Sequence, residues 1–426
     1  MTLLLVLLYI VNWADKAVFG LVAQPLAAEL GLTASQIGLI GSGFFLTFTV
    51  GGFFAGLLNR WLTMRWVMVA LSLAWALTML PLVVVASFAV LLVSRLALGL
   101  AEGPSSALIH TAVYSWHPQE KRGLPGAWIS SGGSIAKIAV APVLAVVAAQ
   151  WGWRAAFIAL AVVGVLWCGL WLSSWKDGPY GESRAGAAGA DEATAVPSHA
   201  VPWTKIFFTP TFLGGGVAVF AMYALVSVVL TWLPSYFEVG LGYSRLQAGA
   251  MFGFPSIAAM VALMVSTSIS DRLLSRGASA RALRGVLPGA GLLLCGMAMV
   301  VLPAVAVPAA AVLLVSVGYG LGAIVLPLFN AAISQICPPR QLAGSLGVFL
   351  GVMSAGGLIA PYLTGVIVDA AESPASGYAA AFQIFGAAAV VASVIALVAV
   401  NPERDAAKVL GPRDPQRVAD PAHRHP

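Results

Sequence analysis

The sequence YIVNWADKAVF, residues 9–19, places a carboxylate next to an ammonium group inside an apolar run that spans residues 2–26. A run of that length can cross a bilayer, so we expect Asp15 and Lys16 near mid-membrane. Each ionised side chain there costs roughly 2.5 to 3.5 kcal/mol. Both groups should therefore face protein or water, and the rest of the chain should build a hydrated cavity around them.

The composition is that of a polytopic membrane protein. Charged residues are 9% of the 426 residues, hydrophobic residues are 60%, and the mean hydropathy is +0.93, whereas about a quarter of the residues in soluble domains are charged. The basic residues fall at predicted helix ends, so the pI of 9.4 does not indicate a nucleic-acid partner. Cys168, Cys295 and Cys337 are scattered and predict neither disulfides nor a metal site. No nucleophile and base pair indicates an enzyme, and no cofactor is expected.

Twelve apolar segments predict an all-α membrane protein with two six-helix bundles. The bundles should comprise residues 1–175 and 206–400, joined by a cytoplasmic loop at 176–205 and followed by a disordered cytoplasmic tail at 401–426. The expected spans are residues 2–26, 35–58, 66–87, 89–114, 124–150, 155–175, 212–235, 248–270, 285–305, 307–333, 342–368 and 378–400.

The distribution of positive charge predicts the orientation. With the amino terminus in the cytoplasm, only Arg154 and Arg245 among the 22 Lys and Arg residues fall in outer loops. This bias places both termini in the cytoplasm, as expected for a multi-pass protein of a bacterial inner membrane. Met1 opens directly onto the first apolar run, so we do not expect a removable signal peptide.

The two halves of the chain echo each other. The sequence LLVS occurs at residues 91–94 and again at 313–316, at the start of the fourth span of each half. A basic loop follows the second span of each half, GLLNRWLTMR at 56–65 and SDRLLSRG at 270–277. Many secondary carriers build a substrate site at the interface of two such repeats.

These features, with five further motifs, resemble the major facilitator superfamily over essentially the whole chain. The closest likeness is to the anion:cation symporter family, whose members carry sugar acids such as galactonate and glucarate, and phthalate and tartrate. The motifs are NWADK at 12–16, RLALGLAEGP at 95–104, WGWR at 151–154, WLPSY at 232–236 and APYLTG at 360–365. The resemblance implies alternating access and proton sites on the first and fourth helices. The sequence departs from the family at Lys16, where Arg is usual, and at Asn59, where Asp is usual.

Five charges lie within predicted spans, all in the first half: Asp15, Lys16, Arg95, Glu102 and Lys137. Arg95 and Glu102 are seven residues apart, so they share a helix face at a separation of about 10 Å, and each is free to meet a partner from another helix. The aligned positions of the second half, Val317 and Ile324, are neutral. We therefore assign proton handling to the amino-terminal bundle.

The charge count suggests how the site works. With both carboxylates ionised the set has one cation in excess, and protonation of either acid strengthens its attraction for an anion. We expect Glu102 to couple protonation to substrate binding, and Asp15 to be a second proton site held by Arg95 or Lys16. Lys16 and Lys137 should meet the substrate carboxylate. The resemblance supports the roles of Asp15, Arg95 and Glu102, whereas Lys137 depends on the physical argument alone.

Each assignment has a structural alternative. The Asp15 carboxylate could form an ion pair that only fixes helix packing, and Lys137 could extend to the membrane surface. Polar groups that could contact substrate hydroxyls are also ordinary contacts between membrane helices; the candidates are Asn12, Ser106, Ser131, Tyr223, Tyr319 and Asn330. His110 is expected to be a packed histidine rather than a proton relay.

The two basic loops are expected to gate the cytoplasmic side. The candidate residues are Gly56, Asn59 and Arg60 in the first copy, and Asp271 and Arg272 in the second. In the resembling family an Asp at the position of Asn59 interacts with a helix amino terminus and latches this side shut. Asn59 lacks that charge, so we expect a less firmly held outward-open state.

The sequence thus predicts a monomeric, proton-driven importer of an organic anion such as a sugar acid or another carboxylate. Sodium in place of protons remains open, and the sequence does not select the anion. A proton antiporter that exports drugs is the alternative within transport, although it would favour an acidic cavity. A membrane sensor with a carrier fold would be expected to have a long ordered cytoplasmic extension.

Overall fold

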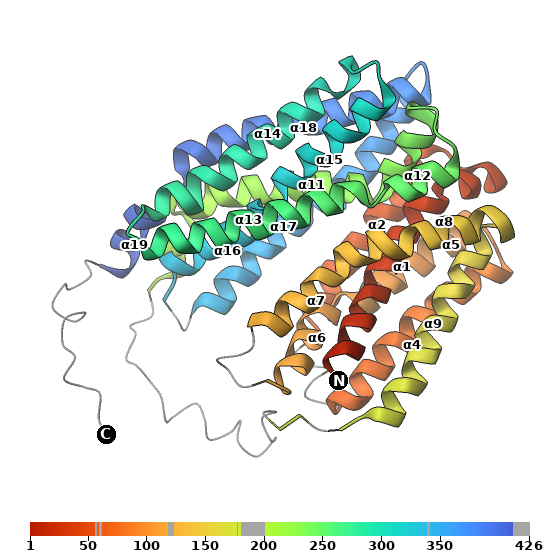
Figure 1. Ribbon diagram of the computed structural model, residues 1–426, viewed down its shortest axis with the longest axis horizontal. Coiled ribbons are helices and arrows are strands. Elements are labelled where there is room, and N and C mark those ends of the chain that lie inside the picture. Colours follow the sequence, from red (N-terminus) through yellow and green to blue (C-terminus); the bar gives the residue numbers. More distant parts are fainter. Residues whose placement is uncertain are drawn as a thin grey trace.

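The computed structural model describes residues 1–55, 58, 62–117, 123–176, 178–179, 201–338 and 341–411, and every regular element in these ranges is helical. Twelve helical segments within them are long and apolar enough to cross a membrane. They form two bundles, one from the first half of the chain and one from the second (Figure 1). The prediction of an all-α membrane protein with twelve spans in two bundles is confirmed.

The amino-terminal bundle has six spans, two of which are interrupted. The fourth span breaks after Glu102, and the fifth contains one π-helical turn, η2. Its elements are α1 (Thr2–Leu30), α2 (Ala34–Gly52), α4 (Met64–Val84), α5 (Phe88–Glu102), α6 (Ser105–Tyr114), α7 (Gly123–Ile135), η2 (Ala136–Val140), α8 (Ala141–Trp151) and α9 (Trp153–Ser174).

The carboxy-terminal bundle follows a short helix, α10 (Trp203–Phe207), which lies partly within the predicted central loop. Its elements are α11 (Pro210–Ser235), η3 (Tyr236–Gly240), α12 (Arg245–Met251), α13 (Phe254–Ser275), η4 (Ala282–Val286), α14 (Leu287–Val301), η5 (Leu302–Ala304), α15 (Pro308–Gly322), α16 (Val325–Ile336), α17 (Leu342–Ala370) and α18 (Pro374–Ala399).

The first helix ends at a signal that the sequence carries. Gly31 has a φ of 62°, a left-handed conformation that favours glycine, and it directs the chain back toward the membrane. Thr33 then starts α2 with a capping box, in which its side chain accepts from the main-chain N–H of Gln36 and the Gln36 side chain accepts from the N–H of Thr33. The result is a tight turn that places α1 and α2 side by side. We call the end of the molecule that contains this turn the distal end.

The two bundles cross near the distal end, where α2 packs against α17, α1 against α11 and α8 against α12. At this crossing main chains are in direct contact, because a methyl group at Gly20 would overlap the carbonyl of Leu230 and one at Gly38 would overlap that of Pro361. From the crossing the bundles diverge toward the end at which α1 begins (Figure 1).

One carboxylate ties the bundles together at the distal end. Asp369, near the end of α17, accepts hydrogen bonds of 2.8 Å from the main-chain N–H groups of both Ala34 and Ser35. These N–H groups have no partner within α2 because they belong to its first turn. Asp369 therefore caps a helix of the opposite bundle and holds the distal end closed.

The chain after residue 400 corrects one prediction. Residues Pro402–Leu410 form the helix α19, so the predicted disorder from residue 401 is wrong for this segment. Asp405 is fully buried and accepts from the main-chain N–H and the hydroxyl of Thr211 at 2.9 and 2.7 Å. Burial opposes ionisation, but the hydrogen bonds from Arg404 and Thr211 outweigh it and lower the pKa of Asp405. The four charged residues of this nine-residue segment concealed its buried face.

Candidate substrate and coupling site

The coupling acid of the predicted site is completely buried. Glu102 is the last residue of α5 and is 0% exposed, and its Oε2 forms an ion pair with Nζ of Lys16 on α1. Lys16 also donates to Oδ1 of Asn12, one helical turn earlier, at 2.6 Å. Asn12, Lys16 and Glu102 therefore form one polar network that joins the first and fourth spans, as the spacing of Arg95 and Glu102 allowed.

Arg95 and Asp15 meet in a way that the sequence did not predict. Nη1 of Arg95 donates to the main-chain carbonyl of Asp15 at 3.2 Å, and the guanidinium carbon lies 4.4 Å from the centre of the Phe19 ring. Neither Lys16 nor Arg95 forms a hydrogen bond or ion pair with the Asp15 carboxyl among the described residues, because Lys16 pairs with Glu102 and Arg95 contacts the main chain. That one of them holds Asp15 as a second proton site stays a prediction. Glu102, Lys16 and Arg95 are nevertheless the charged neighbours of that carboxyl.

Several polar atoms of this network have no hydrogen-bond partner among the described residues. They include Nδ2 of Asn12, Oδ1 of Asp15, both Nε and Nη2 of Arg95, and Oε1 of Glu102. Asp15 is 2% exposed and Arg95 is 3% exposed, so these groups are buried without satisfaction, which is costly for charged side chains. Such groups are available for a ligand or a proton.

Lys137 lies on the π-helical turn η2 and is 7% exposed. Its Nζ lies 5.4 Å from the centre of the Trp13 ring and 5.7 Å from that of Tyr319, which belongs to the opposite bundle. No carboxylate among the described residues lies within ion-pair distance of it. Lys137 is therefore a buried cation between the bundles, rather than one that extends to the membrane surface.

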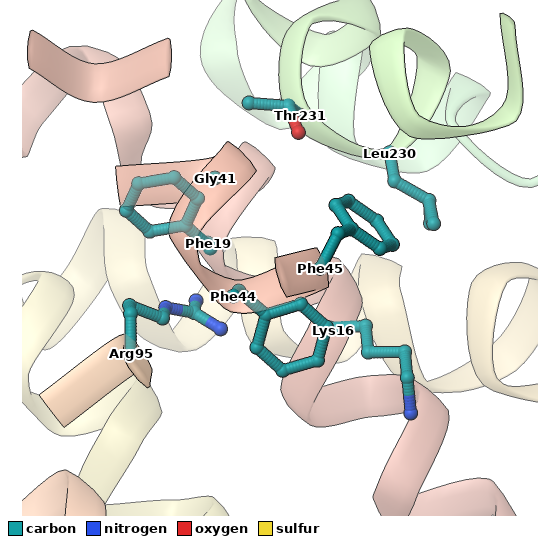
Figure 2. Close-up of a pocket in the computed structure, with 8 residues that line it drawn as sticks. All are labelled: Lys16, Phe19, Gly41, Phe44, Phe45, Arg95, Leu230 and Thr231. Atoms are coloured by element: carbon teal, nitrogen blue, oxygen red, sulfur yellow. The ribbon is translucent and has the colours of Figure 1, made fainter. Parts of the chain in front are cut away.

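A cleft of about 280 Å³, open mouth included, lies between the bundles next to this network. Figure 2 shows the ring of Phe44 between the side chains of Arg95 and Lys16, with Thr231 and Leu230 of α11 on the opposite wall. The residues that line it are Lys16, Phe19, Gly41, Phe44, Phe45, Arg95, Leu230 and Thr231. The cleft thus combines cations from one bundle with neutral groups from both.

Three of the predicted neutral candidates lie beside a buried cation or the cleft. Asn12 contacts Lys16, and the ring of Tyr223 packs edge-on against Phe45 at 5.9 Å. Tyr319 lies beside Lys137, as described above. That these side chains contact the substrate stays a prediction.

The remaining neutral candidates lie in other surroundings. Ser131 is half-buried and donates to the carbonyl of Ala127 on its own helix. Ser106 lies 3.4 Å from the hydroxyl of Tyr9, and Oδ1 of Asn330 on α16 is buried with no partner in the described chain. A role of these three residues in substrate binding stays a prediction.

His110 is a packed side chain, as the sequence analysis expected. Its Nδ1 donates to the carbonyl of Ser106 at 2.7 Å, and its ring packs edge-on against Tyr9 and Tyr114. Among the described residues, none of the five charges in the site forms a hydrogen bond or ion pair with this ring.

The predicted gate stays a prediction. Gly56, Asn59 and Arg60 lie outside the described residues, as does the side chain of Asp271. Arg272 lies in the last turn of α13 and has an interaction partner.

Sequence reasoning missed the aromatic lining of the cleft. Phe19, Phe44 and Phe45 were not singled out, because a phenylalanine in a membrane span has the same sequence signature whether it faces lipid or a cavity. Thr231 was also missed, although it directly precedes the WLPSY motif. Its position next to a recognised motif was the one signal in the sequence that could have identified Thr231 as a cleft residue.

The arrangement of twelve spans in two bundles is that of a known family of membrane proteins. The family model of the Major Facilitator Superfamily matches residues 5–324 and 289–423. The chain belongs to this superfamily. It is similar to the hexuronate transporter of Bacillus subtilis, with 27% identity over 407 residues and 94% of each chain covered. It is also similar to the probable sulfoacetate transporter SauU of Cupriavidus necator, with 28% identity over 413 residues, 93% of this chain and 92% of that protein.

Among solved structures, this superfamily member is similar to a bacterial homolog of the human lysosomal transporter Spinster in an inward-facing and unoccupied conformation. The TM-score is 0.75 at 19% identity, covering 97% of this chain and 98% of the other. These comparisons confirm the resemblance to carriers of sugar acids and other anions. The protein is a transporter, not an enzyme.

Proposed function

We propose that the protein is a secondary active transporter that imports a small organic anion, a sugar acid or another carboxylate, in symport with protons. The observation that carries this proposal is the ion pair between Glu102 and Lys16, buried beside the inter-bundle cleft. The cations Lys16, Arg95 and Lys137 outnumber the carboxylates Asp15 and Glu102, which favours an anionic cargo.

The ion pair offers a direct coupling mechanism. While Glu102 is ionised, its carboxylate occupies Lys16 and competes with any other anion. When Glu102 takes up a proton, Lys16 loses its partner and becomes free for the cargo. Proton binding therefore strengthens anion binding, and by thermodynamic reciprocity anion binding strengthens proton binding to the same extent.

Asp15 and Arg95 extend this mechanism. The guanidinium of Arg95 has N–H groups without partners and lines the cleft, so it is suited to bind a carboxylate through two parallel hydrogen bonds. Asp15 lies next to it with an unpartnered oxygen. We assign Arg95 to the cargo and Asp15 to a second proton, whose uptake removes a competing negative charge from the neighbourhood of Arg95.

The arrangement of the bundles fits one half of an alternating-access cycle. The distal end is held closed by Asp369, and the bundles diverge toward the end at which α1 begins (Figure 1). With both termini in the cytoplasm, as the distribution of Lys and Arg predicts, this is an inward-facing state. Release of cargo and protons into the alkaline cytoplasm from this state supports import.

The test is uptake by proteoliposomes that contain the purified full chain, with labelled hexuronate or sulfoacetate as the probe. A pH gradient with an alkaline interior should drive accumulation at least severalfold above equilibrium, because each transported anion carries protons down their gradient. A sodium gradient imposed at equal pH on both sides should have no effect. Accumulation driven by sodium alone would transfer the coupling role to that ion.

The same vesicles distinguish the proposed importer from a drug-exporting antiporter. For an exporter, an imposed gradient would expel a lipophilic cation and leave the anions unaffected. If neither gradient moves any anion, the transport proposal fails and a sensor that only binds its ligand becomes the leading function.

A further inference from the structure

The coupling mechanism uses Lys16 and Arg95 but leaves Lys137 without a function. Lys137 is 7% exposed, and the described chain offers it no carboxylate partner. Its Nζ lies over the rings of Trp13 and Tyr319. An aromatic ring face attracts a cation but does not neutralise it, so the described chain offers Lys137 no compensating negative charge.

The three cations of the cavity are separated by aromatic rings. Phe44 lies between Arg95 and Lys16, with its ring centre 5.9 Å from each charged group. Trp13 lies 5.4 Å from the Nζ atoms of both Lys16 and Lys137. The indole ring thus keeps the two ammonium groups within twice that distance of each other.

The charges of these groups balance everywhere except at Lys137. Glu102 neutralises Lys16 directly, and Asp15 is a charged neighbour of Arg95. The one cation in excess is therefore located at Lys137, next to Trp13 and to Tyr319 of the opposite bundle. Protonation of Glu102 would free Lys16 as a second cation beside the same Trp13 ring.

We propose that Lys137 is a second anion-binding group, and that the protein carries a short dianion with one acidic group on Arg95 and Lys16 and the other on Lys137. This inference rests on the proposed function, since it specifies the class of anion that the transporter selects. The two relatives described above leave the charge of the cargo open, because a hexuronate has one acidic group and sulfoacetate has two.

The spacing limits the size of the cargo. Carbon–carbon bonds are about 1.5 Å long, and charge-assisted hydrogen bonds add about 2.8 Å at each end. Because the Nζ atoms of Lys16 and Lys137 lie at most twice 5.4 Å apart, at most about 5 Å remains between the outer oxygens of the cargo. This length corresponds to a dianion of about four carbons in all, carboxyl carbons included. The spacing thus favours a short aliphatic dianion over a larger one.

Lys137 has one structural alternative. Because Trp13 and Tyr319 belong to different bundles, the ammonium group could simply link them and stabilise the closed distal half. That role would affect every cargo equally, since it acts on the conformational equilibrium. A role in binding affects only anions that carry a second charge.

The test compares matched anions on the purified full chain, with dissociation constants measured by calorimetry. The pairs are galactarate and galactonate, sulfoacetate and acetate, and succinate and butyrate, in which one member carries an additional acidic group. The wild type should bind the dianion of its preferred pair at least tenfold more tightly than the monoanion. Lys137→Met should weaken the dianion at least tenfold and the monoanion less than threefold, and Lys137→Arg should restore most of the preference.

A lysine on the exposed face of α19 provides the control, because Lys408→Met should change neither member of a pair. Equal binding of both members by the wild type, or equal weakening of both in Lys137→Met, would overturn the inference and leave the anion transporter intact. If no anion of the panel binds to the wild type, the proposed function itself fails. If the Lys137→Met protein does not fold, the inference is tested by the preference of the wild type for the dianion and by the preference of Lys137→Arg.

Discussion

The two walls of the cleft differ in kind. The wall built by the amino-terminal bundle carries Arg95 and Lys16, whereas the wall built by the carboxy-terminal bundle carries Leu230 and Thr231 (Figure 2). Buried charges do occur in the carboxy-terminal half, but Asp405 caps α11 and makes no contact with the cleft. The difference indicates that one bundle recognises charge and the other recognises shape.

This division has a mechanical advantage. Because Glu102 and its partner Lys16 lie within one bundle, the coupling ion pair forms and breaks without any movement between bundles. The moving partner contributes neutral contacts, whose strength changes little with protonation. In the proposed cycle, titration and rocking would thus be separate steps that are connected through the cargo. The following experiments test this division, from the largest expected effect to the smallest.

The largest effect is expected at the coupling acid. Glu102→Gln should reduce accumulation driven by a pH gradient to background, because the variant has no carboxyl group to bind the proton and leaves Lys16 permanently free. Exchange of labelled for unlabelled anion across the vesicle membrane should persist. Glu372→Gln, which alters an exposed acid between α17 and α18, is the matched control, and normal accumulation by Glu102→Gln would disprove the coupling role.

Arg95 should be the strongest single determinant of affinity. Removing one member of a buried, hydrogen-bonded charge pair costs about 2 to 5 kcal/mol, so Arg95→Gln should raise the dissociation constant of the anion roughly 30-fold or more. Arg95→Lys should lie between this variant and the wild type, since it keeps the charge but not the two parallel donors. Calorimetric titration measures both, and a change below threefold in Arg95→Gln would contradict the assignment.

A neutral residue of the opposite wall should behave differently. Thr231→Val keeps the shape of the side chain and removes one hydroxyl, a loss of about 1 kcal/mol that corresponds to roughly fivefold in affinity. The pH dependence of anion binding should be unchanged, because Thr231 does not titrate. A shift of that pH dependence in Thr231→Val would contradict the claim that only the amino-terminal wall takes part in titration.

Asp405 should affect stability alone. Loss of the carboxylate in Asp405→Asn should destabilise the folded protein by about 1 to 3 kcal/mol without changing anion affinity, which thermal unfolding and calorimetry would show. The pKa of Asp405 is lowered in the folded protein, so its contribution is present above the usual pKa of an aspartate and disappears as the pH falls through the lowered value. The wild type should therefore lose more stability than Asp405→Asn on acidification.

The sequence predicted the members of the charged network but not their pairing. Charges within apolar spans are rare enough to be recognised directly, and all five expected ones are present and mostly buried. Asp15 adjoins Lys16 in the chain, which made that pair attractive. Consecutive residues on a helix, however, point in different directions, and the packing of α1 against the fourth span turned Lys16 toward Glu102.

The same limit explains the other differences. From the sequence, the phenylalanines of the cleft could not be distinguished from lipid-facing ones. Only the relative placement of the helices decides which helix face lines a hydrated cavity. The helix α19 was missed because its stability comes from a tertiary contact between Asp405 and Thr211. Patterns along the chain therefore identified spans and charges, whereas side-chain partners required the packed structure.

Contact between bare main chains at Gly20 and Gly38 has a consequence for the speed of the transport cycle. The glycines have no side chain that would have to change rotamer when one helix moves past the other. Asp369 accepts two hydrogen bonds at the same end of the molecule, and hydrogen bonds to a charged group are worth about 1.5 to 3 kcal/mol each. In the proposed cycle, outward opening breaks these bonds, so charged contacts with an arriving solute would have to be of similar strength.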